Sequence, residues 1–117
     1  MLFDLRTYTC RPGTLKLHMA LYAEHGFRAQ VRHLSHPLLY GITESGPLNS
    51  YVHVWAFADA ADRTYRRAQM ELDPEWIAYR KLSAEAAYLV AQENRLLTGA
   101  PFFHPQSAAN HLGSFPQ

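Results

Sequence analysis

The chain lacks the features that mark several classes of protein. Its only cysteine, Cys10, excludes an intramolecular disulfide and any cysteine-rich zinc or iron–sulfur site. No run of apolar residues approaches the roughly 20 that cross a bilayer, so we expect no membrane partner. Eleven Lys and Arg against ten Asp and Glu give a net charge of +1, without the basic excess typical of nucleic-acid-binding proteins. Motifs for a Gly-rich phosphate loop, a serine nucleophile elbow or paired catalytic carboxylates are also missing.

The remaining composition is that of one folded domain. Hydrophobic residues make up 48% of the 117 residues and charged residues 18%, which excludes intrinsic disorder. A strand-like pattern begins at once in MLFDLRTYTC and leaves no room for a targeting peptide, so we expect a cytoplasmic protein. We predict a folded domain over residues 1–98 and a proline-containing tail over residues 99–117.

Hydrophobic periodicity divides the domain into strands and helices. Period-two alternation and short apolar runs predict four strands, at residues 2–10, 38–44, 51–57 and 89–97. A period of 3.6 predicts helices, at residues 14 to about 30, from a cap at Asp59 to Leu72, and onward from a cap at Asp73. Residues 31–37 are predicted to be a connection.

This order, β-α-β-β-α-β with a divided second helical stretch, predicts an α+β fold. The simplest arrangement is a four-stranded antiparallel ferredoxin-like sheet with helices on one face. Along the third strand, the small residues Val52, Val54 and Ala56 suit packing against helices. The other parity would then leave a row of large aromatic side chains on the free face, at Tyr51, His53, Trp55 and Phe57. Because monomers rarely expose such a patch, we expect a homodimer that covers sheet with sheet and encloses a cavity.

At this point the sequence resembles the NIPSNAP family of dimeric α+β barrel proteins. The resemblance runs from residue 3 to about residue 105 and rests on five segments, FDLRTYTCRPG, ESGPLNSYVHVWAF, DRTYRRA, DPEWIAY and ENRLLTGAPFFHP. It implies the dimeric α+β barrel fold, in agreement with the parity argument, and it implies no established reaction. Barrels of similar build include cofactor-free monooxygenases, lactone isomerases, polyketide cyclases and haem proteins, which is an analogy of fold alone.

Polar side chains on two strands form the candidate site. Arg6 and Tyr8 share one face of the first strand, and His53 and Trp55 share one face of the third. His53 is a candidate proton shuttle near neutral pH, and Arg6 could hold a carboxylate or an enolate, with Tyr8 as a third catalytic candidate. Further ligand-binding candidates are Trp55, Tyr51, Glu44 and His25. The alternative is that these groups form a hydrogen-bonded polar layer at the dimer interface.

Histidines invite a metal hypothesis that their spacing does not support. Four occur at positions 18, 25, 33 and 36, but no two are separated by the four residues of a helical zinc motif, so we predict no metal site. Haem needs only one axial histidine, for which His25 or His53 could serve.

Other clusters have ordinary structural explanations. Three arginines, Arg63, Arg66 and Arg67, each have an acidic residue four positions away, which is typical of a solvated helix face. Trp76 and Tyr79 follow a helix start on its apolar face and are assigned to core packing.

Three functions are compatible with this pattern. The leading hypothesis is a barrel that binds a small anionic or aromatic molecule in the inter-sheet cavity, and that could be a cofactor-free enzyme using histidine acid–base chemistry. One alternative is a non-catalytic homodimer that acts as a scaffold or binds a partner. The other is a haem-binding protein.

Overall fold

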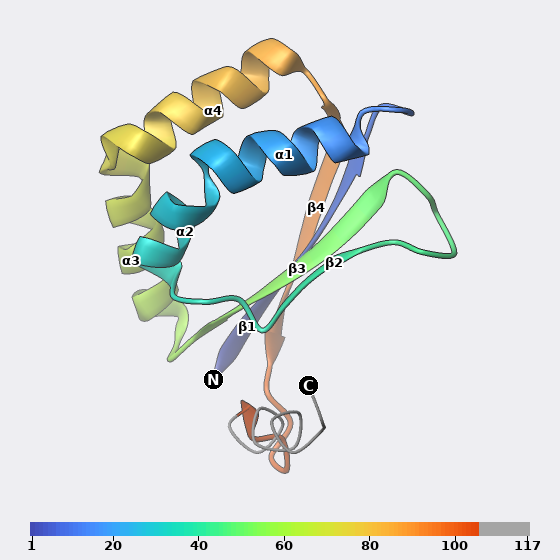
Figure 1. The fold of residues 1–117 in the computed structure, drawn as a ribbon. Helices are drawn as coiled ribbons and strands as arrows, with labels where there is room; N and C mark the ends of the chain where they lie inside the picture. Colours follow the sequence, from blue (N-terminus) through green and yellow to red (C-terminus); the bar gives the residue numbers. More distant parts are fainter. Residues whose placement is uncertain (106–117) are drawn as a thin grey trace, which may run out of the picture.

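The computed structural model describes residues 1–105 as one α+β structure, with a sheet and a layer of helices (Figure 1). The elements are β1 (Leu2–Cys10), α1 (Leu15–His25), α2 (Phe27–Leu34), β2 (Leu39–Ile42), β3 (Ser50–Phe57), α3 (Ala60–Leu72), α4 (Pro74–Ala86) and β4 (Leu89–Thr98). No helix within the described residues is long and apolar enough to cross a membrane. Residues 106–117, most of the predicted tail, lie outside the described part of the chain.

The strands form one antiparallel sheet in the order β2-β3-β1-β4. Figure 1 shows all four helices on the same side of this sheet. The predicted ferredoxin-like α+β fold is therefore confirmed. Because β1 and β3 are central neighbours, Arg6 lies directly opposite His53, and Tyr8 lies opposite Tyr51.

The first helical stretch differs from the prediction of one helix followed by a connection. It is divided at Gly26 into α1 and α2, and helical structure continues to Leu34. A Cβ atom at Gly26 would lie 2.9 Å from Cγ of Tyr79, so α4 approaches the chain too closely here for any side chain. The need for glycine at the division thus comes partly from a neighbouring helix, which the periodicity of residues 14–34 does not reveal.

The predicted caps of the other helices are confirmed. The Asp59 carboxylate accepts the backbone N–H of Asp62 at 2.8 Å, and the Asp62 carboxylate accepts that of Ala58 at 3.0 Å. At the next helix, Asp73 accepts the backbone N–H of Glu75 at 2.9 Å, with proline at the first helical position. These contacts satisfy N–H groups that have no partner inside the helix, and they are local in sequence.

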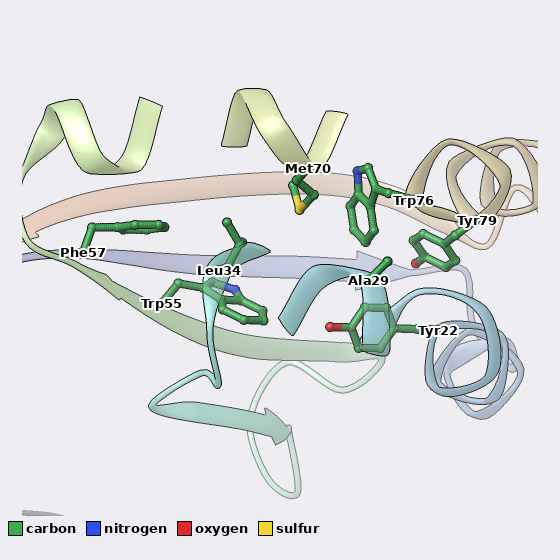
Figure 2. Packing of buried hydrophobic residues seen from close by; sticks show 8 residues of the cluster. All are labelled: Tyr22, Ala29, Leu34, Trp55, Phe57, Met70, Trp76 and Tyr79. Carbon is green, nitrogen blue, oxygen red and sulfur yellow. The ribbon is translucent and has the colours of Figure 1, made fainter. Parts of the chain in front are cut away.

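The side chains of β3 face the opposite way from the prediction. The large residues Tyr51, His53, Trp55 and Phe57 point toward the helices, and each is at most 2% exposed. Figure 2 shows two of them in the core that the sheet forms with the helices, among Tyr22, Ala29, Leu34, Trp55, Phe57, Met70, Trp76 and Tyr79. Large rings fill the space between the layers and bury more apolar area than valine or alanine would. The argument for a dimer from an open aromatic face is therefore wrong.

The open face of the sheet carries smaller side chains. The register places the half-buried residues Leu5, Val52, Val54 and Ala56 on this face, and Leu39 beside them is 52% exposed. One end of the face is covered by the segment after β4, because the Phe103 ring packs edge to face on Phe3 with ring centroids 5.6 Å apart. The rest of this face is not covered by any helix of residues 1–105 (Figure 1).

Candidate functional site

A cavity of about 410 Å³ lies between the sheet and the helices of the single chain. Its sheet wall includes Arg6, Tyr8, Tyr51 and His53, so the structure brings together four of the residues singled out from the sequence. The prediction placed them in a cavity between the sheets of two chains. That location is wrong, because reversed strand parity turns these side chains toward their own helices.

Three other predicted site residues do not line the cavity. Trp55 lies behind His53, and its indole N–H donates to Nδ1 of His53 at 2.7 Å. Glu44 is exposed in the connection between β2 and β3. His25 ends α1 with its side chain 41% exposed, 3.6 Å from the carboxylate of Glu24. The predictions of Glu44 and His25 as cavity ligands are therefore wrong. Trp55 is connected to the cavity only indirectly, through its hydrogen bond to His53.

His53 is held in one neutral form. Since Nδ1 accepts the hydrogen bond from Trp55, the proton of the neutral ring is on Nε2, a buried atom with no acceptor in residues 1–105. Its ring stacks on Tyr40 and meets Tyr8 edge to face, with centroids 4.8 Å apart in both pairs. Burial, assisted by the positive charge of Arg6, lowers the pKa of His53 to about 3. The assignment of His53 as a proton shuttle near neutral pH is therefore not supported.

Arg6 is committed to contacts within its own strand. Its Nη1 donates to the Asp4 carboxylate at 3.0 Å, and its Nε donates to the hydroxyl oxygen of Tyr8 at 2.8 Å. Asp4 is 1% exposed and also accepts from Arg63 at 3.0 Å and Asn94 at 3.1 Å. Burial raises the pKa of Asp4, but the Asn94 amide and the two guanidinium groups outweigh it, so the pKa is lowered overall.

The role of Asp4 could have been found in the sequence. Alternation along β1 puts Asp4, Arg6 and Tyr8 on one face, which is enough to predict contacts between them. The sequence does not reveal the two other partners of Asp4, because Arg63 is on α3 and Asn94 is on β4.

Arg67 is the functional candidate that sequence reasoning missed. It lies on α3, is half-buried and lines the cavity. Burial, followed by repulsion from Arg6 and Arg63, lowers its pKa. Within residues 1–105 its guanidinium makes no hydrogen bond or ion pair. A signal existed, because Arg63 and Arg67 share a helical stripe with Met70, which is 1% exposed.

The predicted ion pairs of the arginine cluster form at one position only. Arg66 donates to Asp62 at 2.8 Å, as expected for residues four apart. Arg63 instead reaches Asp4, and Glu71, the expected partner of Arg67, pairs with Arg80 at 3.0 Å. Two of the three arginines therefore face the protein interior, and the prediction of a solvated face is wrong for them.

Phenol and indole groups complete the walls. The cavity is also lined by Tyr22, Tyr40, Trp76 and Tyr79, which come from α1, β2 and α4. Burial raises the pKa of every one of these tyrosines, that of Tyr79 to about 12, so their hydroxyl groups stay protonated. The indole N–H of Trp76 is buried without an acceptor in residues 1–105. The cavity thus presents aromatic surfaces, N–H and O–H donors, and positive charge.

Haem, thiol and metal chemistry have little support among the described residues. Among the described residues, His25 lies off the cavity wall, and because Nδ1 of His53 accepts from Trp55, its Nε2 carries the ring proton and offers no lone pair to haem iron. Cys10 is 1% exposed, and burial raises its pKa, which disfavours the reactive thiolate. In the described residues, no three His, Cys, Asp or Glu side chains are grouped as metal ligands.

Comparisons with known proteins extend these observations. The family model described as NIPSNAP matches residues 3–104. The chain is 29% identical to an uncharacterised NIPSNAP domain protein from Burkholderia xenovorans, with a TM-score of 0.82 over 89% of this chain and 99% of that one. It is 31% identical to a NIPSNAP family protein of unknown function from Agrobacterium tumefaciens, with a TM-score of 0.80 over 88% and 91% of the two chains.

Two further matches are more limited, the first in coverage and the second in sequence identity. A NipSnap homolog from Dictyostelium discoideum is 35% identical over 75 residues, which are 64% of this chain, and the chain spans 33% of that protein's length. The crystal structure of an antibiotic biosynthesis monooxygenase matches with a TM-score of 0.58 at 16% identity, over 86% of this chain and 100% of that one. The likeness to the monooxygenase shows a shared fold alone.

Proposed function

We propose that this chain, which belongs to the NIPSNAP family, binds a small anionic aromatic molecule in the cavity between its sheet and its helices. The observation that carries the proposal is Arg67, a half-buried cation on the cavity wall with no acidic partner in residues 1–105. The volume of about 410 Å³ lies within the range of ordinary small-molecule sites.

The charges around the cavity favour an anionic ligand. Three guanidinium groups, of Arg6, Arg63 and Arg67, lie near a single buried carboxylate, Asp4, which accepts from only the first two. The acidic residue on the cavity wall, Glu71, is paired with Arg80 at 3.0 Å. A partly desolvated cation without a counter-charge is costly, and the lowered pKa of Arg67 reflects that cost. A carboxylate or another oxyanion would offset it and would form a charge-assisted hydrogen bond with the guanidinium.

The walls favour a planar ligand. Tyr22, Tyr40 and Tyr51 form a series of stacked rings, with centroids 5.1 Å apart in the first pair and 5.7 Å in the second. Trp76 and Tyr79 from α4 add to these walls, and Tyr79 meets Tyr22 edge to face with ring centroids 5.7 Å apart (Figure 2). Aromatic side chains bind flat apolar groups through large contact areas and preferred stacking geometries.

The binding proposal is tested with a matched pair of ligands and a matched pair of variants. Calorimetry should show that wild-type protein binds naphthoate about tenfold more tightly than its neutral amide, because only the acid pairs with Arg67. Arg67→Gln should remove this discrimination, whereas Arg66→Gln, on the same helix but paired with Asp62, should retain it. Equal affinities in all three proteins would place the anion site elsewhere. Absence of binding would instead favour a non-catalytic scaffold.

We also propose that the chain forms a homodimer through the open face of the sheet. The half-buried Leu5, Val52, Val54 and Ala56 give this face an apolar centre that suits a flat, two-fold contact. The dimer prediction is thus kept with the opposite strand parity. Each chain has its own cavity on the far side of its sheet, so dimer formation and ligand binding are separable.

A further inference from the structure

Tyr8 is a hydrogen-bond donor without an acceptor at the cavity. Its hydroxyl oxygen accepts the Nε–H of Arg6 at 2.8 Å, and the side chain lines the cavity. A phenol carries one proton and can accept through its oxygen lone pairs. Since Arg6 occupies the accepting side, the O–H is left to donate, and within residues 1–105 it has no acceptor.

The neighbours of Tyr8 hold and polarise this donor. Arg6 is fixed between Tyr8 and Asp4, and Asp4 is fixed in turn by Arg63 and Asn94. These groups form one continuous hydrogen-bonded network from β1 to α3 and β4. A cationic donor to the phenol oxygen strengthens the phenol as a donor, because hydrogen bonds in a chain polarise one another. The network therefore prepares Tyr8 O–H to meet negative charge.

We propose that Tyr8 and Arg67 together bind the charged oxygen of an ionised phenol or an enolate, with Arg6 as the residue that positions and polarises Tyr8. This inference rests on the binding function proposed above and narrows the ligand to one chemical class. In such a ligand the charged oxygen is attached directly to a planar group, which the stacked rings of Tyr22, Tyr40 and Tyr51 can accommodate. A neutral O–H donor and a cation that act on one oxygen stabilise its charge in the way of an oxyanion hole.

Arg6 and His53 support Tyr8 rather than contacting the charged oxygen of the ligand themselves. Arg6 touches Asp4 and Tyr8, so it acts on a ligand through Tyr8. His53 is a neutral ring that packs against Tyr8 with centroids 4.8 Å apart and limits the positions open to the phenol. Three charged groups influence the ionisation of His53, namely Asp4 and Arg6 of β1 and Arg67 of α3. Its neutral titratable neighbours are Tyr40 of β2 and His18 of α1.

The experiment uses para-nitrophenol, which ionises close to neutral pH and whose phenolate absorbs visible light. Wild-type protein should bind the phenolate about tenfold more tightly than the phenol, so the bound probe ionises about one pH unit lower than the free probe. Tyr8→Phe keeps the ring and removes the hydroxyl, and it should abolish most of this preference. Arg6→Gln should weaken the binding of the phenolate more than that of para-nitroanisole, which cannot ionise, because only the phenolate depends on the polarised Tyr8 hydroxyl. Tyr65→Phe makes the same chemical change at an exposed position of α3 and should have no effect.

The results separate the two proposals. If Tyr8→Phe keeps the full phenolate preference while Arg67→Gln loses the preference for naphthoate, the role of Tyr8 is wrong and anion binding in the cavity stands. If wild-type protein binds naphthoate but neither para-nitrophenol, in either ionisation state, nor para-nitroanisole, the narrower ligand class is wrong and anion binding stands. If it binds none of these probes, both proposals are overturned. Near-ultraviolet circular dichroism of each variant identifies any that has lost its native packing.

Discussion

The two faces of the sheet receive alternate residues of the same strands, yet they differ in size, charge and exposure. On the helix face, β1 and β3 place charged, phenolic and indole side chains, among them the buried Asp4 and Trp55. On the open face the same strands place Leu5, Val52 and Val54, which remain half-exposed. The face with the larger and more polar side chains is the buried one, because only there do rings and hydrogen-bonding partners from the helices meet them.

This comparison shows that polarity alone does not identify the solvent side of a sheet. Asp4 is buried, and its carboxylate accepts hydrogen bonds from three side chains, those of Arg6, Arg63 and Asn94. A charge that is paired and hydrogen-bonded in this way can be kept inside a domain. The charged groups and the cavity are thus placed together on one face.

The largest loss of stability is expected for a substitution at the centre of the helix face. Trp55→Ala should lower the free energy of unfolding by about 3–5 kcal/mol, because it leaves a void in the core and removes the donor to His53. Val54→Ala, at the neighbouring position on the open face, should cost about 1 kcal/mol. Chemical denaturation of both variants measures the difference, and equal losses would mean that the two faces are packed alike.

A second, smaller effect concerns the buried charge of the helix face. Asp4→Asn should cost about 3 kcal/mol at neutral pH, because Arg6 and Arg63 lose their carboxylate partner. Glu93→Gln, an exposed carboxylate on the open face, should change stability by about 0.5 kcal/mol or less.

The buried charge of Asp4 also predicts how stability depends on pH. The pKa of Asp4 is lowered in the folded state, so its contribution to stability is present above its ordinary value of about 4 and is lost as the pH falls through the folded value. Denaturation curves should therefore show a shallower loss of stability in acid for Asp4→Asn than for wild type. An unchanged acid dependence would mean that Asp4 is not stabilised as the carboxylate.

The smallest effect on the fold is expected at the open face. Val54→Lys should leave the melting temperature of the monomer nearly unchanged while it dissociates the proposed dimer, because each copy would bring an unpaired charge into the contact. Light scattering at micromolar concentration measures the mass, and circular dichroism checks the fold. A wild-type monomer, or a variant that remains a dimer, would contradict the proposed interface. Ligand binding should persist in the dissociated variant.

Local patterns were sufficient for much of this fold. Alternation in residues 2–10 predicted a strand with Asp4, Arg6 and Tyr8 on one face, and the Asp59 and Asp73 caps predicted two helix starts. These features depend on backbone geometry over a few residues, and that geometry is repeated wherever the pattern occurs. The element order then predicted the ferredoxin-like sheet and the contact of β1 with β3.

The residue sequence determined which side chains share a face, and the tertiary structure decided which face the helices cover. Alternation sorts the residues of a strand into two sets but does not say which set faces the helices. In β3 both sets are apolar enough to be buried, so the pattern did not decide between them. The direction follows from the fit of Trp55 and Phe57 against α2 and α3. The close approach of Tyr79 to Gly26 and the repulsion of Arg67 by Arg6 likewise arise from segments that are distant in sequence, α4 and β1.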